Sequence, residues 1–264
     1  MSLRCSILLA LACAGAATGL RAAPAAAEDF PRLGFYGSVH GDGTPYVNPA
    51  TGLLDTTVIA AVSRFDDVIL DVNPVSPYRP DIVLAMKQRH PGMRAIAYVL
   101  GGDYYPDLDA DSLNQIPTLI YRMLRHVDGF LYDQNTGLPI DQQGTNLAKK
   151  DASGRFVVAD SLAILLRDHV IAAGIWDGIF TDIFPHTVGW IQNGTSTVID
   201  YARAGYPSLA ALDLAWSQAA DTLASRLRAY GGPNFVLIGN SGLSAEHAWY
   251  NGWMREDFPF QEGG

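Results

Sequence analysis

Cysteine is almost absent from this chain of 264 residues: there are two, Cys5 and Cys13, and both lie within the first 27 residues. Without that segment the chain has no thiol, which excludes disulfide bonds and cysteine-ligated metal sites. Beyond it, no apolar run reaches the ~20 residues that a membrane-spanning helix needs. Basic residues are outnumbered 18 to 27 by acidic ones, and the net charge of −9 argues against a nucleic-acid partner, which would select a basic surface.

The first 27 residues have the order of a secretory signal peptide. Arg4 precedes an apolar run over residues 7–17, and the small residues 25–27 precede Glu28 and Asp29. We therefore expect cleavage near Ala27 and a secreted or periplasmic protein. A lipid anchor at Cys13 is the less favoured alternative, because Ala10 stands where lipoprotein signals usually have leucine. Residues 28–264 are long enough to form one domain.

Short apolar runs alternate with longer amphipathic ones through the rest of the chain. The runs predict six strands: 33–39, 67–72, 94–100, 177–183, 235–239 and 250–255. Helical spacing is found at 55–63, 80–89, 113–126, 161–173 and 207–230, and an irregular polar stretch covers 128–155. Strands separated by helices imply a parallel sheet with helices packed on it.

Two α/β folds fit this alternation, an open doubly wound sheet and a (β/α)8 TIM-type barrel. The doubly wound fold is disfavoured because the glycine-containing turn at 41–43 leads into a polar loop instead of a helix. We expect the barrel. Only about six βα units are found, so we expect a barrel that is truncated at its C-terminal end.

In such a barrel the chemistry lies where the strands end. Asp182 closes an apolar strand, and Glu256 follows the sixth strand. Hydrolysis of a glycosidic bond needs two carboxyl groups, one of which protonates the leaving oxygen. We therefore predict Asp182 and Glu256 as the catalytic pair. Each also has a structural alternative: Asp182 as a cap or a partner of a buried arginine, and Glu256 as a helix cap or in a surface ion pair with Arg255.

Three motifs resemble a known group. The segment 177–182 (DGIFTD) is similar to the "D-G-hydrophobic-aromatic-x-D" strand of glycoside-hydrolase-like (β/α) barrels, bacterial proteins related to the endo-α-1,4-polygalactosaminidase family. The segments 239–242 (GNSG) and 251–256 (NGWMRE) are similar to the fifth-strand turn and sixth strand of that group. The resemblance implies a fourth-strand aspartate nucleophile and a later acid, which again points to Asp182 and Glu256.

Other polar and aromatic residues near the strand ends are candidates for binding the sugar: Tyr36, Asp71, Tyr98, Asn240, His186 and Trp190. Asp177 opens its strand at the opposite end and is expected to be structural. His186 has no second histidine at ligand spacing, so we predict neither a metal nor a cofactor. We thus expect a hydrolase of extracellular or cell-surface polysaccharide. The alternative is a non-catalytic carbohydrate-binding protein on a barrel scaffold.

Overall fold

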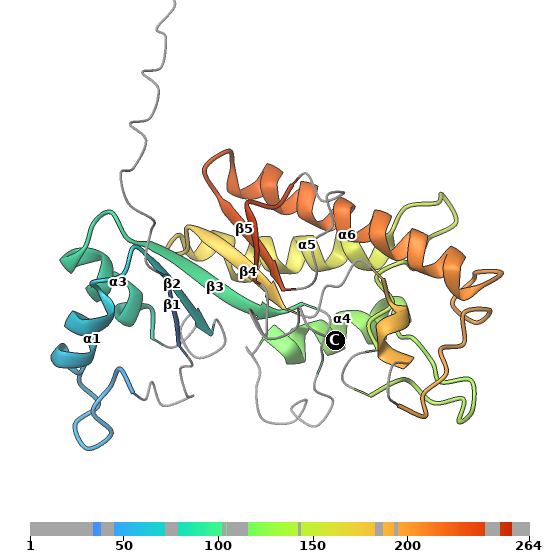
Figure 1. The fold of residues 1–264 in the computed structure, drawn as a ribbon, viewed down its shortest axis with the longest axis horizontal. Coiled ribbons are helices and arrows are strands. Elements are labelled where there is room, and N and C mark those ends of the chain that lie inside the picture. Colours follow the sequence, from blue (N-terminus) through green and yellow to red (C-terminus); the bar gives the residue numbers. More distant parts are fainter. Residues whose placement is uncertain are drawn as a thin grey trace, which may run out of the picture. The chain divides into compact units, whose positions relative to one another are not determined.

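Parallel strands alternate with helices along the chain in a computed structural model, which describes residues 34–37, 45–71, 79–101, 104, 116–141, 144–182, 187–192, 195–240 and 249–254. All of these fall within one unit, Arg32–Gly264. The strands are β1 (Gly34–Gly37), β2 (Asp67–Asp71), β3 (Arg94–Leu100), β4 (Gly178–Asp182), β5 (Val236–Asn240) and β6 (Gly252–Met254). The helices are α1 (Thr56–Val62), α3 (Pro80–Arg89), α4 (Ile116–Val127), α5 (Val157–His169) and α6 (Leu209–Gly231), with 3₁₀ turns η2 (Ile171–Ala173) and η3 (Gly189–Gln192) (Figure 1). The predicted α/β class is confirmed.

The strands form one sheet in sequence order, β1-β2-β3-β4-β5-β6, and every neighbouring pair is parallel. Since each connection moves one position in the same direction, right-handed crossovers place all the connecting helices on one face of the sheet.

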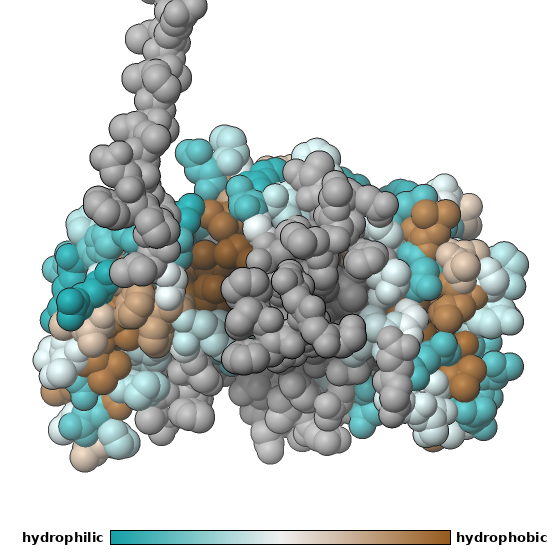
Figure 2. All heavy atoms as spheres, viewed as in Figure 1, coloured by the Kyte–Doolittle hydropathy of each residue, from teal (hydrophilic) through white to brown (hydrophobic). Residues whose placement is uncertain are grey.

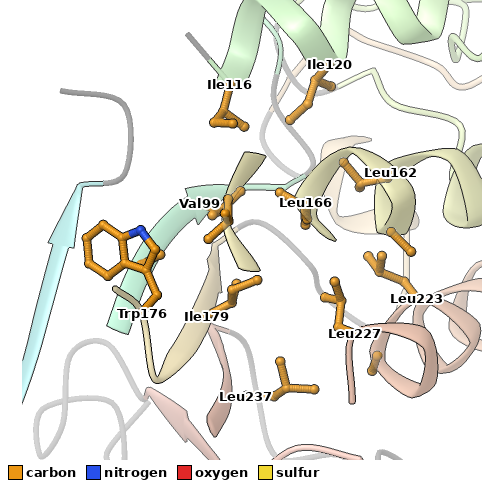
Figure 3. Packing of buried hydrophobic residues seen from close by; sticks show 14 of the residues in the cluster. Val99, Ile116, Ile120, Leu162, Leu166, Trp176, Ile179, Leu223, Leu227 and Leu237 are labelled. Atoms are coloured by element: carbon orange, nitrogen blue, oxygen red, sulfur yellow. The ribbon is translucent and has the colours of Figure 1, made fainter. Parts of the chain in front are cut away.

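The helix-covered face carries the main hydrophobic core. Strand residues such as Val99, Ile179 and Leu237 are fully or almost fully buried there against side chains of α4, α5 and α6 (Figure 3). Side chains of α1 and α3 belong to the same cluster. The opposite face has a smaller cluster of strand residues alone: Ile96, Phe180 and Val236, with Ile69, Tyr98 and Ile238 packed against them. Both faces are apolar, as is typical of parallel strands.

Helices α5 and α6 pack side by side over β4 and β5 (Figure 1). Their contact includes Leu162 and Leu166 of α5 and Leu223 and Leu227 of α6, all at most 1% exposed (Figure 3). Apolar burial on this scale is the main source of stability for a helical layer.

The boundaries of α5 differ from the sequence expectation of 161–173. The helix begins a turn earlier, at Val157, because Val158 and Ala159 already face the core. It ends at His169, and the following 3₁₀ turn closes at Gly174, which has a left-handed φ of 68°. That conformation is open to glycine without steric cost.

The side chain of Asp55 caps α1: its Oδ1 accepts hydrogen bonds from the backbone N–H groups of Thr57 (2.9 Å) and Val58 (3.1 Å). We expect Asp55→Ala to lower the free energy of unfolding by about 1 kcal/mol, because two helix donors lose their acceptor. Asp55→Asn keeps an oxygen acceptor and should lose only a few tenths of a kcal/mol. Urea unfolding of both variants measures this, and equal losses would contradict the capping role.

Two long connections, 128–156 before α5 and 187–208 before α6, are bound to each other. The Oδ1 atom of Asp133 accepts from the backbone N–H of Val198 (3.0 Å). The N–H of Gln134 donates to the carbonyl of Val198 (2.7 Å), and Asn135 Nδ2 donates to the carbonyl of Ser196 (3.0 Å). We call this set of contacts the Asp133 clasp. It joins two irregular segments that are about 60 residues apart in the sequence.

Exposed hydrophobic side chains are distributed over several elements. On the face shown in Figure 2, hydrophobic residues lie in separate areas divided by hydrophilic ones. Scattered apolar residues of this kind are ordinary for a protein surface. Within the described ranges, no helix combines the length and the hydropathy that a membrane crossing would require.

Candidate functional site at the carboxyl ends of the strands

Five of the predicted site residues lie on one face of the sheet, the face opposite the helices. Asp71 is in register with Tyr98, and Tyr98 with Phe180, so these three side chains share a face. Asp182 follows Phe180 by two residues and therefore points to the same side. By the same two-residue period this face includes two more residues at strand ends, Tyr36 of β1 and Asn240 of β5. The strand ends thus bring together side chains from across the sequence.

Asp182 is the centre of this group. Its Oδ1 accepts a hydrogen bond from Asn240 Nδ2 (2.7 Å), and its Oδ2 accepts one from the Tyr98 hydroxyl. The two donors come from the neighbouring strands β5 and β3. A carboxylate has acceptor sites only, and each of the two oxygens of Asp182 accepts a hydrogen bond. The arrangement presents a partly buried carboxylate at the end of β4.

Tyr98 is held by aromatic neighbours on its own face of the sheet. Its ring stacks on Phe180, with centroids 5.5 Å apart, and meets Tyr36 edge-on at 5.4 Å. Burial raises the pKa of the Tyr98 hydroxyl far above its ordinary value, and the hydrogen bond to Asp182 and the charge of that carboxylate raise it further. Tyr36 adds to the same effect. Tyr98 therefore keeps its proton and remains a donor.

The first residues of the motif 177–182 are structural, as expected for Asp177. Asp177 Oδ2 accepts from the backbone N–H of Ala95 (2.8 Å) and pairs with Lys87 Nζ (2.7 Å). Gly178 lies between Ile96 and Val236, and a Cβ there would collide with the backbone carbonyl of Val236. Of this motif, Phe180 and Asp182 take part in the strand-end group, Phe180 through its stacking on Tyr98.

Because the collision at Gly178 involves backbone atoms, we expect Gly178→Ala to cost about 1–3 kcal/mol of unfolding free energy. The matched control is Gly34→Ala in β1, where a Cβ would meet nothing within 4 Å. Thermal or urea unfolding compares the two variants. Equal stabilities would show that the glycine is not required for strand packing.

The remaining predicted residues are not part of the described group. Trp190 lies in η3, partly buried against the main core on the helix side, and its indole Nε1 is buried without a hydrogen-bond partner. His186 and Glu256 lie outside the described residues. Among the residues that the structure does describe, no three histidine, cysteine or acidic side chains come together as a metal site would require.

Two contributions to the site were missed by the sequence analysis. Phe180 was part of the motif, yet its role as the platform beneath Tyr98 was not foreseen. Tyr98 and Asn240 were interpreted as sugar ligands, and the structure directs both onto Asp182. These contacts follow from the register of β3 against β4, which places Tyr98 directly beside Phe180 and two residues before Leu100, the neighbour of Asp182.

No model of a known protein family matches the chain, and no curated protein matches its sequence.

Proposed function

We propose that the sheet is the described part of a TIM-type (β/α) barrel. Sequential strand order, parallel pairing and helices on a single face all favour it. A doubly wound sheet would reverse its strand order at a switch point and carry helices on both faces. In a barrel, the cluster of Ile96, Phe180 and Val236 would be the start of the packed interior.

On this scaffold we propose the hydrolysis of glycosidic bonds, with Asp182 as one of two catalytic carboxyl groups. One observation carries the proposal: Asp182 closes β4 on the face opposite the described helices, with a neutral donor from each neighbouring strand on its two oxygens. Carboxyl ends of barrel strands are where catalytic residues gather. A carboxylate held in this way is suited to act on an oxocarbenium-like transition state, as a nucleophile or as a base for water.

Glu256 is proposed as the partner acid. It follows β6 by two residues, and β6 is two strands from β4 in the sheet. The separation of the two carboxyl groups would set the stereochemistry: about 5 Å for retention, and roughly 6.5–9.5 Å for inversion.

Sugar binding is proposed for Tyr36 and Asp71, an aromatic and an acidic residue on the same face of the sheet as Asp182. Tyr36 is 53% exposed, and its ring is suited to pack against the apolar face of a sugar. Asp71 ends β2 on the same face and is suited to accept hydrogen bonds from hydroxyl groups. The proposed substrate is an extracellular or cell-surface polysaccharide, in keeping with the secretory signal that the first 27 residues predict.

The release of reducing ends tests this function. The first substrate is α-1,4-linked polygalactosamine, chosen from the family resemblance, followed by neutral α- and β-linked polysaccharides. We expect turnover of at least one of them by the wild-type protein and none by Asp182→Asn. Turnover that persists in the variant would contradict the role of Asp182.

The alternative is a non-catalytic carbohydrate-binding protein. One observation favours it: both oxygens of Asp182 already accept hydrogen bonds, as they would in a purely structural carboxylate. On this alternative, the wild type and Asp182→Asn would both bind a polysaccharide in affinity electrophoresis, and neither would cleave it.

A further inference from the structure

We infer that a groove between α5 and α6 is a second binding site, which takes an uncharged sugar unit of a polysaccharide. The two helices lie side by side (Figure 1), and the groove is on the outer surface of the layer that they form. Asp182 points to the opposite face of the sheet. That the sugar belongs to a substrate chain rests on the proposed function, but that the groove binds a sugar is a separate claim.

The groove is formed by side chains of both helices. Its volume is about 290 Å³, close to the lower limit of ~300 Å³ for small-molecule pockets, so its size suits a single small unit. Arg155 and residues of α5 at the spacing of one helical turn line one side, and Arg226 and Tyr230 of α6 line the other. The α5 residues are Val157, Asp160, Ser161 and Ile164.

Two ion pairs give the groove its polar character. Arg226 Nε lies 3.0 Å from Asp160 Oδ1, so this pair connects the two sides. Arg155 donates to Asp151 Oδ2 from Nη2 (2.7 Å) and from Nε (2.9 Å). A guanidinium has five N–H donors and a carboxylate has several acceptor sites, so each pair has capacity for a further ligand. The hydroxyl groups of a sugar both donate and accept, and can therefore use both members of a pair.

The same pairs favour an uncharged ligand over an anion. Both arginines that line the groove already face a carboxylate. A phosphate or sulfate would have to displace a carboxylate that the chain itself holds in place. Asp160 also occupies the first turn of α5, where the helix dipole would otherwise favour a bound anion. A neutral sugar requires neither displacement nor repulsion.

The apolar part of the lining suits the C–H groups of a sugar. Ile164 is 44% exposed on α5, and Tyr230 lines the groove from α6 while it packs against the main core. The guanidinium of Arg167 lies over the Tyr230 ring, 5.2 Å from its centroid, and helps to hold the ring in place. Sugars have apolar C–H surfaces that pack on such side chains. Apolar groups beside paired charges therefore match both kinds of sugar surface.

Arg226→Met tests the inference, because methionine keeps an apolar stem and removes every donor of the guanidinium. The matched control is Arg89→Met. Arg89 is exposed in the last turn of α3 and is not part of the groove lining. Both substitutions are made in the Asp182→Asn background, so that no sugar is cleaved during the measurement. Circular dichroism establishes that both variants are folded.

Binding is measured by calorimetric titration with the hexasaccharides of α-1,4- and β-1,4-linked glucose, and with inorganic phosphate as the anion. We expect one sugar-binding event whose affinity falls about 10-fold or more in Arg226→Met, because hydrogen bonds to a charged group are lost. Arg89→Met should keep the affinity of the parent. A separate binding event at the strand-end group would be common to both variants.

Three results would overturn the inference: no binding of either sugar, sugar binding that is equal in the two variants, or Arg226-dependent binding of phosphate alone. These results are distinct from failure of the proposed function. Absence of turnover by the wild type would refute the hydrolase and leave an Arg226-dependent sugar site established. Turnover without any Arg226-dependent binding would refute the groove site and leave the proposed function in place.

Discussion

The substitution Asp182→Asn is expected to lower the rate of polysaccharide hydrolysis by at least about 10³-fold, equivalent to about 4 kcal/mol of transition-state stabilisation. The amide has nearly the same shape as the carboxylate, but it carries no negative charge for an oxocarbenium-like transition state. The fold should survive, because the amide oxygen still accepts from Asn240 or Tyr98. We expect a loss of about 1 kcal/mol or less in the free energy of unfolding.

Asp177→Asn is the matched control, at the residue that directly precedes β4. Its carboxylate accepts from the N–H of Ala95 and pairs with Lys87, at the end of β4 away from the site. The control should lose stability to a similar extent and keep its kcat within about threefold, since it touches no proposed reacting group. If both variants lost activity equally, the effect would be one of strand stability, and Asp182 would have no special role.

The largest effect on stability is expected from Leu223→Ala. Leu223 is fully buried where α6 meets α5, and removing its side chain leaves a cavity in the main core (Figure 3). Substitutions of this kind cost about 2–5 kcal/mol. Because Leu223 is fully buried among core side chains of both helices, we expect a cost in the upper half of that range.

Leu214→Ala is the matched control, because it changes helix propensity in the same way but removes no buried side chain. Leu214 lies in the same helix and is 63% exposed, so the same substitution creates no cavity. Its cost should stay within about 0.5 kcal/mol. Urea unfolding of both variants gives the comparison. A cost for Leu223→Ala as small as that for Leu214→Ala would mean that α6 does not pack on α5 as described.

Sequence patterns predicted the elements well where local chemistry determines them. Helix α3 and strand β3 have the predicted bounds, because Pro80 can start a helix and His90-Pro91-Gly92 ends it. The placement of Asp71, Tyr98, Asp182 and Asn240 at strand ends could also be predicted. Asp71, Asp182 and Asn240 each close an apolar run, and Tyr98 lies two residues before the end of β3. The carboxyl ends of parallel strands meet at one edge.

The partners of these side chains could not be predicted. The bond between Tyr98 and Asp182 joins residues 84 positions apart, and it depends on the register of β3 against β4. That register places Leu100, not Tyr98, directly beside Asp182, so Tyr98 reaches the carboxylate diagonally. The periodicity of the sequence does not predict this two-residue offset. It predicted which residues lie at the site, but not which of them form hydrogen bonds with one another.

The Asp133 clasp has a consequence for how this protein can vary. It joins the connection before α5 to the connection before α6 through backbone groups of Gln134 and Val198 as well as through a side chain. Backbone donors and acceptors that lose their partners are costly wherever water cannot replace them. A deletion in one connection therefore removes partners from the other. Insertions and deletions in the two segments should be inherited together, as if they were a single loop.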